Sequence, residues 1–132
     1  MRLLHTMLRV SQLNRSIDFY TGILGMTLLR RHDFSEGRFS LVFLGFGKEE
    51  DNTVLELTHN WDVDKYSLGT AFGHIAIEVE DVYKACDAIR QKGGEVVRAA
   101  GPMKGSDITL AFIKDPDGYL IELLGRPGSR EL

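Results

Sequence analysis

Two histidines and two glutamates occupy matching positions in the two halves of this sequence. His5 and His74 each open a segment of strand-like alternation, and Glu56 and Glu122 follow them by 51 and 48 residues, between apolar neighbours. Such carboxylates are costly to bury unless they are paired or bound to a metal. Imidazole nitrogen and carboxylate oxygen suit Zn(II), Ni(II), Co(II) or Mn(II). The pattern therefore predicts a His₂Glu₂ site, open to water and suited to catalysis, whereas each residue taken alone is also typical of an ordinary strand.

Two further polar residues follow these candidate ligands at a shared interval. Arg9 lies four residues beyond His5, and Asn60 lies four beyond Glu56. Because an even offset keeps one face of a strand, each side chain would stand roughly 13 Å along the strand from its ligand. That distance suits an extended ligand of tripeptide size, with Arg9 binding a carboxylate and Asn60 forming amide hydrogen bonds. Arg9 could equally be a solvated surface charge.

The two halves are related by a concealed repeat with an offset of 69 residues. The aligned pairs are His5 and His74, Val10 and Val79, Leu13 and Val82, Asp18 and Asp87, and Gly25 and Gly94. In each half a strand comes first, then a helix with apolar residues at helical spacing, then glycine at the expected helix end. Shorter strand patterns complete each half, which predicts two β-α-β-β-β modules.

Alternation and turn residues indicate the later strands. They are residues 39–43 and 54–58 in the first half, and residues 95–98, 109–113 and 119–124 in the second. Residues 115–118 (DPDG) predict a tight turn, with proline fixing φ and glycine taking a positive φ. We therefore predict the α+β class: one domain, residues 1–132, built of two tandem modules at about 1–62 and 72–126 with a linker between them.

Composition narrows the classes of function. The 132 residues carry 16 Lys and Arg against 19 Asp and Glu, a net charge of −3 without a basic block, so no nucleic-acid partner is expected. No apolar run approaches the length of a membrane span, and none near the N-terminus is typical of a signal peptide, so no membrane partner is expected either. The single cysteine, Cys86, has no partner for an internal disulfide, which favours a cytoplasmic location.

Short motifs cover nearly the whole chain. They are residues 1–10 (MRLLHTMLRV), 15–20 (RSIDFY), 24–26 (LGM), 55–58 (LELT), 60–61 (NW), 66 (Y), 73–76 (GHIA), 101–105 (GPMKG), 111–113 (AFI), 115–119 (DPDGY) and 121–123 (IEL). Together they resemble the compact bacterial type of the glyoxalase I (lactoylglutathione lyase) family, in the vicinal oxygen chelate (VOC) superfamily. The resemblance implies the glyoxalase/bleomycin-resistance/dioxygenase-like fold.

The resemblance also implies an activity. A lyase of this family isomerises the hemithioacetal of methylglyoxal and glutathione to S-lactoylglutathione, by proton transfer through an enediolate, and so detoxifies methylglyoxal. One divalent metal is implied, with Ni(II) favoured, Co(II) possible and Zn(II) the alternative. The implied ligands are His5, Glu56, His74 and Glu122. Glu122 is expected to act as the base, with Glu56 as its symmetric partner.

A homodimer with active sites between its subunits is implied as well. The first His–Glu pair would come from one chain and the second pair from the other. Arg9 and Asn60 would contact glutathione, in agreement with the strand argument. Lys104 and Gly105 would lie on a loop that closes over the glutathione end.

Three other functions fit parts of the pattern, because fold alone does not fix function. A thiol transferase or an acyl-thioester epimerase would rearrange the ligand set or lack Arg9 and Asn60 at these positions. An extradiol dioxygenase would hold iron with two histidines and one glutamate in one module, which this sequence does not supply. A metal-free protein that sequesters a drug would need no His/Glu set.

Overall fold

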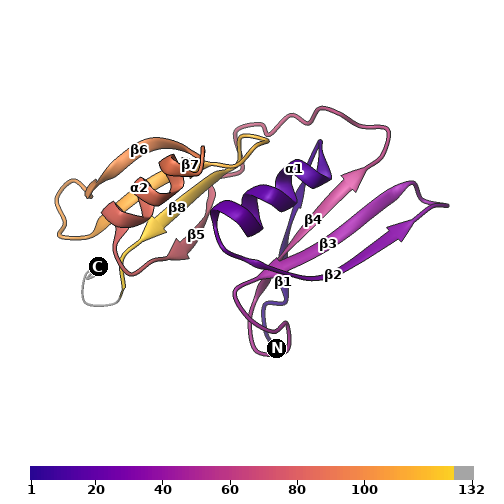
Figure 1. Ribbon diagram of the computed structural model, residues 1–132, viewed down its shortest axis with the longest axis horizontal. Helices are drawn as coiled ribbons and strands as arrows, with labels where there is room; N and C mark the ends of the chain where they lie inside the picture. The colour runs from indigo at the N-terminus through magenta and orange to yellow at the C-terminus, as the bar shows by residue number, and fades with distance from the viewer. Residues whose placement is uncertain (127–132) are drawn as a thin grey trace. The chain divides into compact units, whose positions relative to one another are not determined.

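A computed structural model describes residues 1–126, and their contacts divide the chain into two compact units, Met1–Ser67 and a second that begins at Leu68. The first unit contains, in chain order, β1 (His5–Arg9), α1 (Leu13–Asp18), the π-helical turn η1 (Phe19–Ile23), β2 (Thr27–Phe34), β3 (Phe39–Gly45) and β4 (Val54–Asn60). The second contains β5 (His74–Glu78), α2 (Val82–Gln91), β6 (Glu95–Pro102), β7 (Thr109–Lys114) and β8 (Leu120–Leu124). Figure 1 shows both units.

Each unit is a four-stranded sheet with one topology. The strand orders are β1-β4-β3-β2 and β5-β8-β7-β6, with the first and last strands of each unit parallel and the other pairs antiparallel. The two β-α-β-β-β modules and the α+β class predicted from the sequence are confirmed. The offset of 69 residues relates β1 to β5 residue by residue, since they begin at His5 and His74.

The core of each unit lies between its helix and one face of its sheet. In the first unit the buried strand residues on the helix side include Leu8, Val42, Leu44, Leu55 and Leu57. In the second they include Ala111, Ile113, Ile121 and Leu123, and α2 packs on β6 and β7. Because side chains alternate along a strand, the residues between them point to the opposite face, here called the open face of each sheet.

The helix α2 has the apolar stripe and the following glycine that the sequence predicts, together with a cap that was not predicted. Val82, Cys86 and Ile89 form its buried stripe, and the Asp81 carboxylate caps its start by accepting a hydrogen bond from the Lys84 amide at 3.1 Å. Burial raises the pKa of the Cys86 thiol above its ordinary value, which keeps it protonated and unreactive. Gly93, after the helix, has a φ of 86°, a conformation that glycine adopts without strain.

The structure adds detail that the sequence patterns did not give. The strand β2 had no predicted range, because most of its residues are exposed and show no alternation. The first helix changes from α to π geometry after Asp18. The turn at residues 115–118 is confirmed: Gly118 has a φ of 94°, and the Asp115 carboxylate accepts hydrogen bonds from the amides of Asp117 and Tyr119, both at 2.9 Å. No helix in the described part of the chain could span a membrane.

Candidate metal and substrate site

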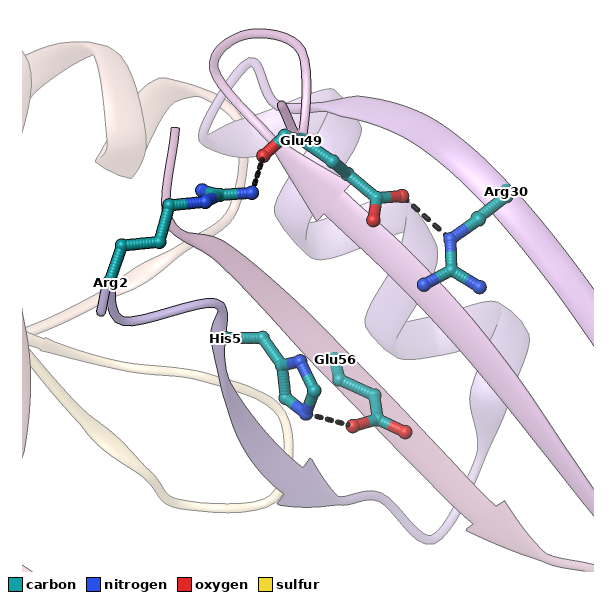
Figure 2. Close-up of polar contacts among 5 residues, drawn as sticks. All are labelled: Arg2, His5, Arg30, Glu49 and Glu56. Atoms are coloured by element: carbon teal, nitrogen blue, oxygen red, sulfur yellow. Dashed lines mark hydrogen bonds and ion pairs between the residues drawn. The ribbon is translucent and has the colours of Figure 1, made fainter. Parts of the chain in front are cut away.

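The first His–Glu pair lies on the open face of the first sheet. The Nε2 atom of His5 is 2.9 Å from a carboxylate oxygen of Glu56, and Figure 2 shows the two side chains reaching toward each other from β1 and β4. The pairing of these parallel strands sets His5 opposite Val54, two residues before Glu56. The imidazole is 38% exposed and the carboxylate 12%, so both donor groups reach an accessible surface.

The second pair repeats this arrangement in the second unit. His74 stands opposite Leu120, again two residues before the glutamate, and its Nε2 atom is 3.5 Å from a carboxylate oxygen of Glu122. Each unit therefore supplies one imidazole nitrogen and one carboxylate at the same register, as the spacing in the sequence predicts.

Each histidine ring also meets a phenylalanine that the sequence analysis did not single out. Phe43 lies opposite Glu56 in the sheet pairing, and Phe112 lies opposite Glu122. The His5 and Phe43 rings meet edge to face at 5.6 Å between centroids, and the His74 and Phe112 rings do so at 5.2 Å. The repeat offset of 69 also separates Phe43 from Phe112, which is the signal that could have identified them.

Arg30 lies over this cluster in the first unit. Its Cζ atom is 3.6 Å from the centre of the Phe43 ring, and its Nε donates a hydrogen bond to the Glu49 carboxylate at 2.7 Å. Arg2 donates to the backbone carbonyl of Glu49, also at 2.7 Å, so Glu49 joins the N-terminal segment to β2 (Figure 2). The linked contacts of Arg2, Glu49, Arg30 and Phe43 were not apparent from the sequence.

The donor atoms fit a divalent cation, although neither unit supplies a complete ligand set. Within residues 1–126 no cluster of three or more His, Cys, Asp or Glu side chains is arranged to hold a metal ion. Each unit instead presents two donors, an imidazole and a carboxylate, which is a combination that Ni(II), Co(II) and Zn(II) accept.

The two residues predicted to bind substrate lie on the open face of the first sheet. Arg9 is the last residue of β1 and Asn60 the last of β4, so both strands extend as far as the argument from even offsets requires. The Asn60 amide nitrogen donates a hydrogen bond to the Tyr66 hydroxyl at 3.1 Å. This bond orients the amide and directs its carbonyl oxygen away from Tyr66. Tyr66 thus supports Asn60, a role that the sequence did not reveal.

Lys104 and Gly105 lie in the turn between β6 and β7. Both are exposed, and Gly105 has a φ of 78°. The amide of Ser106 donates a hydrogen bond to the Met103 carbonyl at 3.0 Å, which closes the turn around them. Their contact with substrate stays a prediction.

A separate groove lies on the helix side of the first sheet. It has a volume of about 620 Å³, and its lining residues include Arg15, Asp33, Ser40, His59 and Trp61. The His59 Nδ1 atom is 3.1 Å from the Val10 carbonyl oxygen; since a carbonyl only accepts, Nδ1 carries the proton. A hydrogen bond from Ser40 lowers the pKa of the Asp33 carboxyl. Because this groove and the His5–Glu56 pair lie on opposite faces, it is not the candidate metal site.

This fold and its repeated donor pairs define a known class of protein. The chain belongs to the Glyoxalase/Bleomycin resistance protein/Dioxygenase superfamily, whose family model matches residues 2–123. Within it, the chain is similar to a lactoylglutathione lyase of Neisseria meningitidis, with 61% identity over 124 residues that cover 94% of this chain and 90% of the relative. A lactoylglutathione lyase of Escherichia coli O157:H7 is 60% identical and is covered to 92%. The family resemblance seen in the sequence is confirmed.

The chain is also similar to solved structures of glyoxalase I. Glyoxalase I from Zea mays has a TM-score of 0.92 and 49% identity; the match covers 95% of this chain but only 44% of the maize chain, so this chain spans less than half of the maize protein. The trypanothione-dependent glyoxalase I of Leishmania major has a TM-score of 0.85 and 48% identity, covering 95% of this chain and 86% of that one.

Proposed function

We propose that this protein is a lactoylglutathione lyase that converts the hemithioacetal of methylglyoxal and glutathione to S-lactoylglutathione. The observation that carries the proposal is the pair of His–Glu contacts at equivalent register in the two sheets. Identity of about 60% to relatives of that name, over nearly their full length, supports the same activity.

The proposed active site belongs to a homodimer. His5 and Glu56 of one chain would meet His74 and Glu122 of the other, which completes the four-ligand set that neither unit supplies alone. Membership of the family implies a divalent metal, and we propose Ni(II), with Co(II) or Zn(II) as alternatives. When bound, the cation would supply Lewis-acid stabilisation of negative charge developing on the substrate oxygens.

The protein's own side chains would bind the substrate and move the proton. Arg9 would bind a glutathione carboxylate and Asn60 would accept an amide hydrogen bond, while the loop with Lys104 and Gly105 covers the glutathione end. Glu122 would take the proton from the carbon that carries sulfur and return it to the neighbouring carbon. No electrons enter or leave, so no redox cofactor is needed. The reaction needs reduced glutathione, which agrees with the cytoplasmic location expected from the single cysteine.

The test is thioester formation from methylglyoxal and glutathione with chelator-stripped protein. We expect no activity without metal and recovery with Ni(II). Recovery of activity with Zn(II) and not with Ni(II) would support the proposed reaction but contradict the proposed choice of metal. Tight metal binding without thioester formation would contradict the proposal and favour a thiol transferase or an epimerase. Failure to retain any divalent metal would favour a drug-sequestering protein. A Glu56→Gln/Glu122→Gln double variant controls for the uncatalysed reaction.

A further inference from the structure

The two His–Glu pairs are equivalent in position but differ in what surrounds them. Both histidines use Nε2 toward the glutamate, and both rings pack against a phenylalanine at nearly the same angle, 80° and 78°. The separation is nevertheless 2.9 Å in the first unit and 3.5 Å in the second. The difference therefore calls for a cause outside the His, Glu and Phe side chains themselves.

The two units also differ at one further equivalent position. Arg30 is the β2 residue opposite Phe43, and Arg98 is the β6 residue opposite Phe112, so the two arginines occupy equivalent places. A register irregularity precedes each of them, between Leu28 and Arg30 and between Val96 and Arg98, which strengthens the equivalence. One residue type in one place thus has two different environments.

In the first unit the guanidinium lies over the aromatic ring. Its Cζ atom is 3.6 Å from the Phe43 ring centre, within the range of a favourable cation–π contact. The Arg30 Nε donates a hydrogen bond to the Glu49 carboxylate, and Arg2 donates one to the backbone carbonyl of Glu49. Phe43 is 4% exposed, so a ring with Arg30 against it has little freedom and keeps its T-shaped contact with His5.

In the second unit the arginine is used elsewhere. Arg98 donates hydrogen bonds to the carbonyls of Ala99, Gly101, Leu110 and Pro102, at 2.9–3.1 Å. These bonds stabilise the irregular part of β6 and commit the guanidinium to the backbone. Phe112 is also more exposed than Phe43. His74 therefore packs against a ring that Arg98 does not clamp.

We propose that Arg30 is a positioning residue that acts through Phe43 on His5 and makes the first unit the pre-organised half of the metal site. The inference rests on the proposed function and deepens it: Arg30 and Phe43 would keep His5 in place beside Glu56, as two of the residues that would hold the cation, whereas Glu122, in the unit without this clamp, would have the freedom of movement that a base requires. The duplicated ligand set is thereby divided into a holding half and a reacting half.

The simpler view is that Arg30 only forms a surface ion pair with Glu49, and such pairs have little effect. Arg31 provides the matched control for this alternative. It is the next residue of β2, its side chain is 44% exposed against 45% for Arg30, and it also pairs with a carboxylate, that of Asp33. Arg31 lines the groove on the helix side, so it faces away from His5.

The experiment measures metal affinity of the full-length protein without reference to turnover. Metal-free wild type, Arg30→Gln and Arg31→Gln are titrated with Ni(II) against a coloured chelator, and the visible spectrum of the Co(II) form is recorded. We expect Arg30→Gln to weaken Ni(II) binding by about tenfold, the size of loss typical when a ligand's supporting contact is removed. Its Co(II) spectrum should also change, whereas Arg31→Gln should match the wild type in both.

A second pair of variants locates the effect. Phe43→Leu should weaken Ni(II) binding as Arg30→Gln does, and adding Arg30→Gln to it should cause little further loss, because both act on His5. Phe112→Leu should have the smaller effect. If folded Arg30→Gln has the Ni(II) affinity and the Co(II) spectrum of the wild type, the inference is wrong. The proposed function would still stand in that case, provided that the wild type binds metal and catalyses the reaction. A wild type that binds no divalent metal would defeat both.

Discussion

At the scale of single residues, the proposed chemistry depends on two carboxylates that the sheets hold in equivalent places. Glu56 and Glu122 are both largely covered by neighbouring residues and each contacts one imidazole. A carboxylate of this kind can serve as a metal ligand, as a base, or as both in turn. We propose that the surroundings assign the roles, because the two pairs differ in spacing and, among residues 1–126, only the first unit has the clamp that Arg30 provides.

Replacement of each glutamate by glutamine separates the roles. We expect Glu122→Gln to lower kcat by about 10²–10⁴-fold, because an amide cannot accept the substrate proton, while part of the metal affinity remains. Glu56→Gln should lose more metal affinity than Glu122→Gln does. Steady-state kinetics and the Ni(II) titration measure both quantities. Wild-type turnover by Glu122→Gln would show that Glu122 is not the base.

At the scale of elements, the two helices begin differently although the repeat aligns their caps. Gln12 and Asp81 both precede their helices with extended backbone, but the Asp81 carboxylate accepts a hydrogen bond from the helix, whereas the Gln12 side chain makes no capping bond. A glutamine side chain is too long to bond the second or third amide of the helix in the way that aspartate does. The first helix is therefore short of one stabilising contact.

A single substitution should supply that contact. We expect Gln12→Asp to raise the free energy of unfolding by about 0.5–1 kcal/mol, measured by urea denaturation, and Asp81→Gln to lower it by a similar amount. If Asp81→Gln destabilises the protein while Gln12→Asp has no effect, the backbone at Gln12 does not accept a cap, and the proposed equivalence of the two starts fails.

Local sequence patterns predicted most elements because their apolar residues repeat with the period of the structure. The strands β1, β5 and β8 alternate in burial, and α2 has one buried stripe. The strand β2 could not be located, since its exposed residues carry no alternation. Repeat positions predicted that each histidine would lie near its glutamate, but the contacts of Arg30 and Tyr66 were not predicted. Those contacts depend on pairing across strands and on side-chain geometry, which spacing along one chain does not encode.

At the scale of the whole molecule, both units share one topology, and each carries one His–Glu pair, which is half of the proposed ligand set. A symmetric dimer would build two identical sites from such a chain, because each site would take the first pair from one protomer and the second from the other. Under that arrangement, a dimer of one substituted and one unsubstituted chain has one altered site and one unaltered site.

Mixing two inactive variants tests this arrangement. When Glu56→Gln and Glu122→Gln proteins are unfolded and refolded together in equal amounts, about half of the dimers should be mixed. Each mixed dimer has one site that carries both substitutions and one that carries neither, so about a quarter of wild-type activity should return. Each variant refolded alone is the control. Absence of any recovery, with mixed dimers verified by mass spectrometry, would place both pairs of a site in one chain.

The chain has one tryptophan, and its position gives the molecule a built-in optical reporter. The Trp61 indole donates a hydrogen bond to Ser40 at 2.9 Å and lies near the Arg38 guanidinium, both in the first unit. Its fluorescence therefore follows the unfolding of that half, whereas far-ultraviolet circular dichroism follows both halves. If the fluorescence and circular dichroism transitions coincide, the two halves unfold together as one cooperative unit. If the tryptophan transition occurs separately, the two repeats unfold independently, each with its own free energy of unfolding.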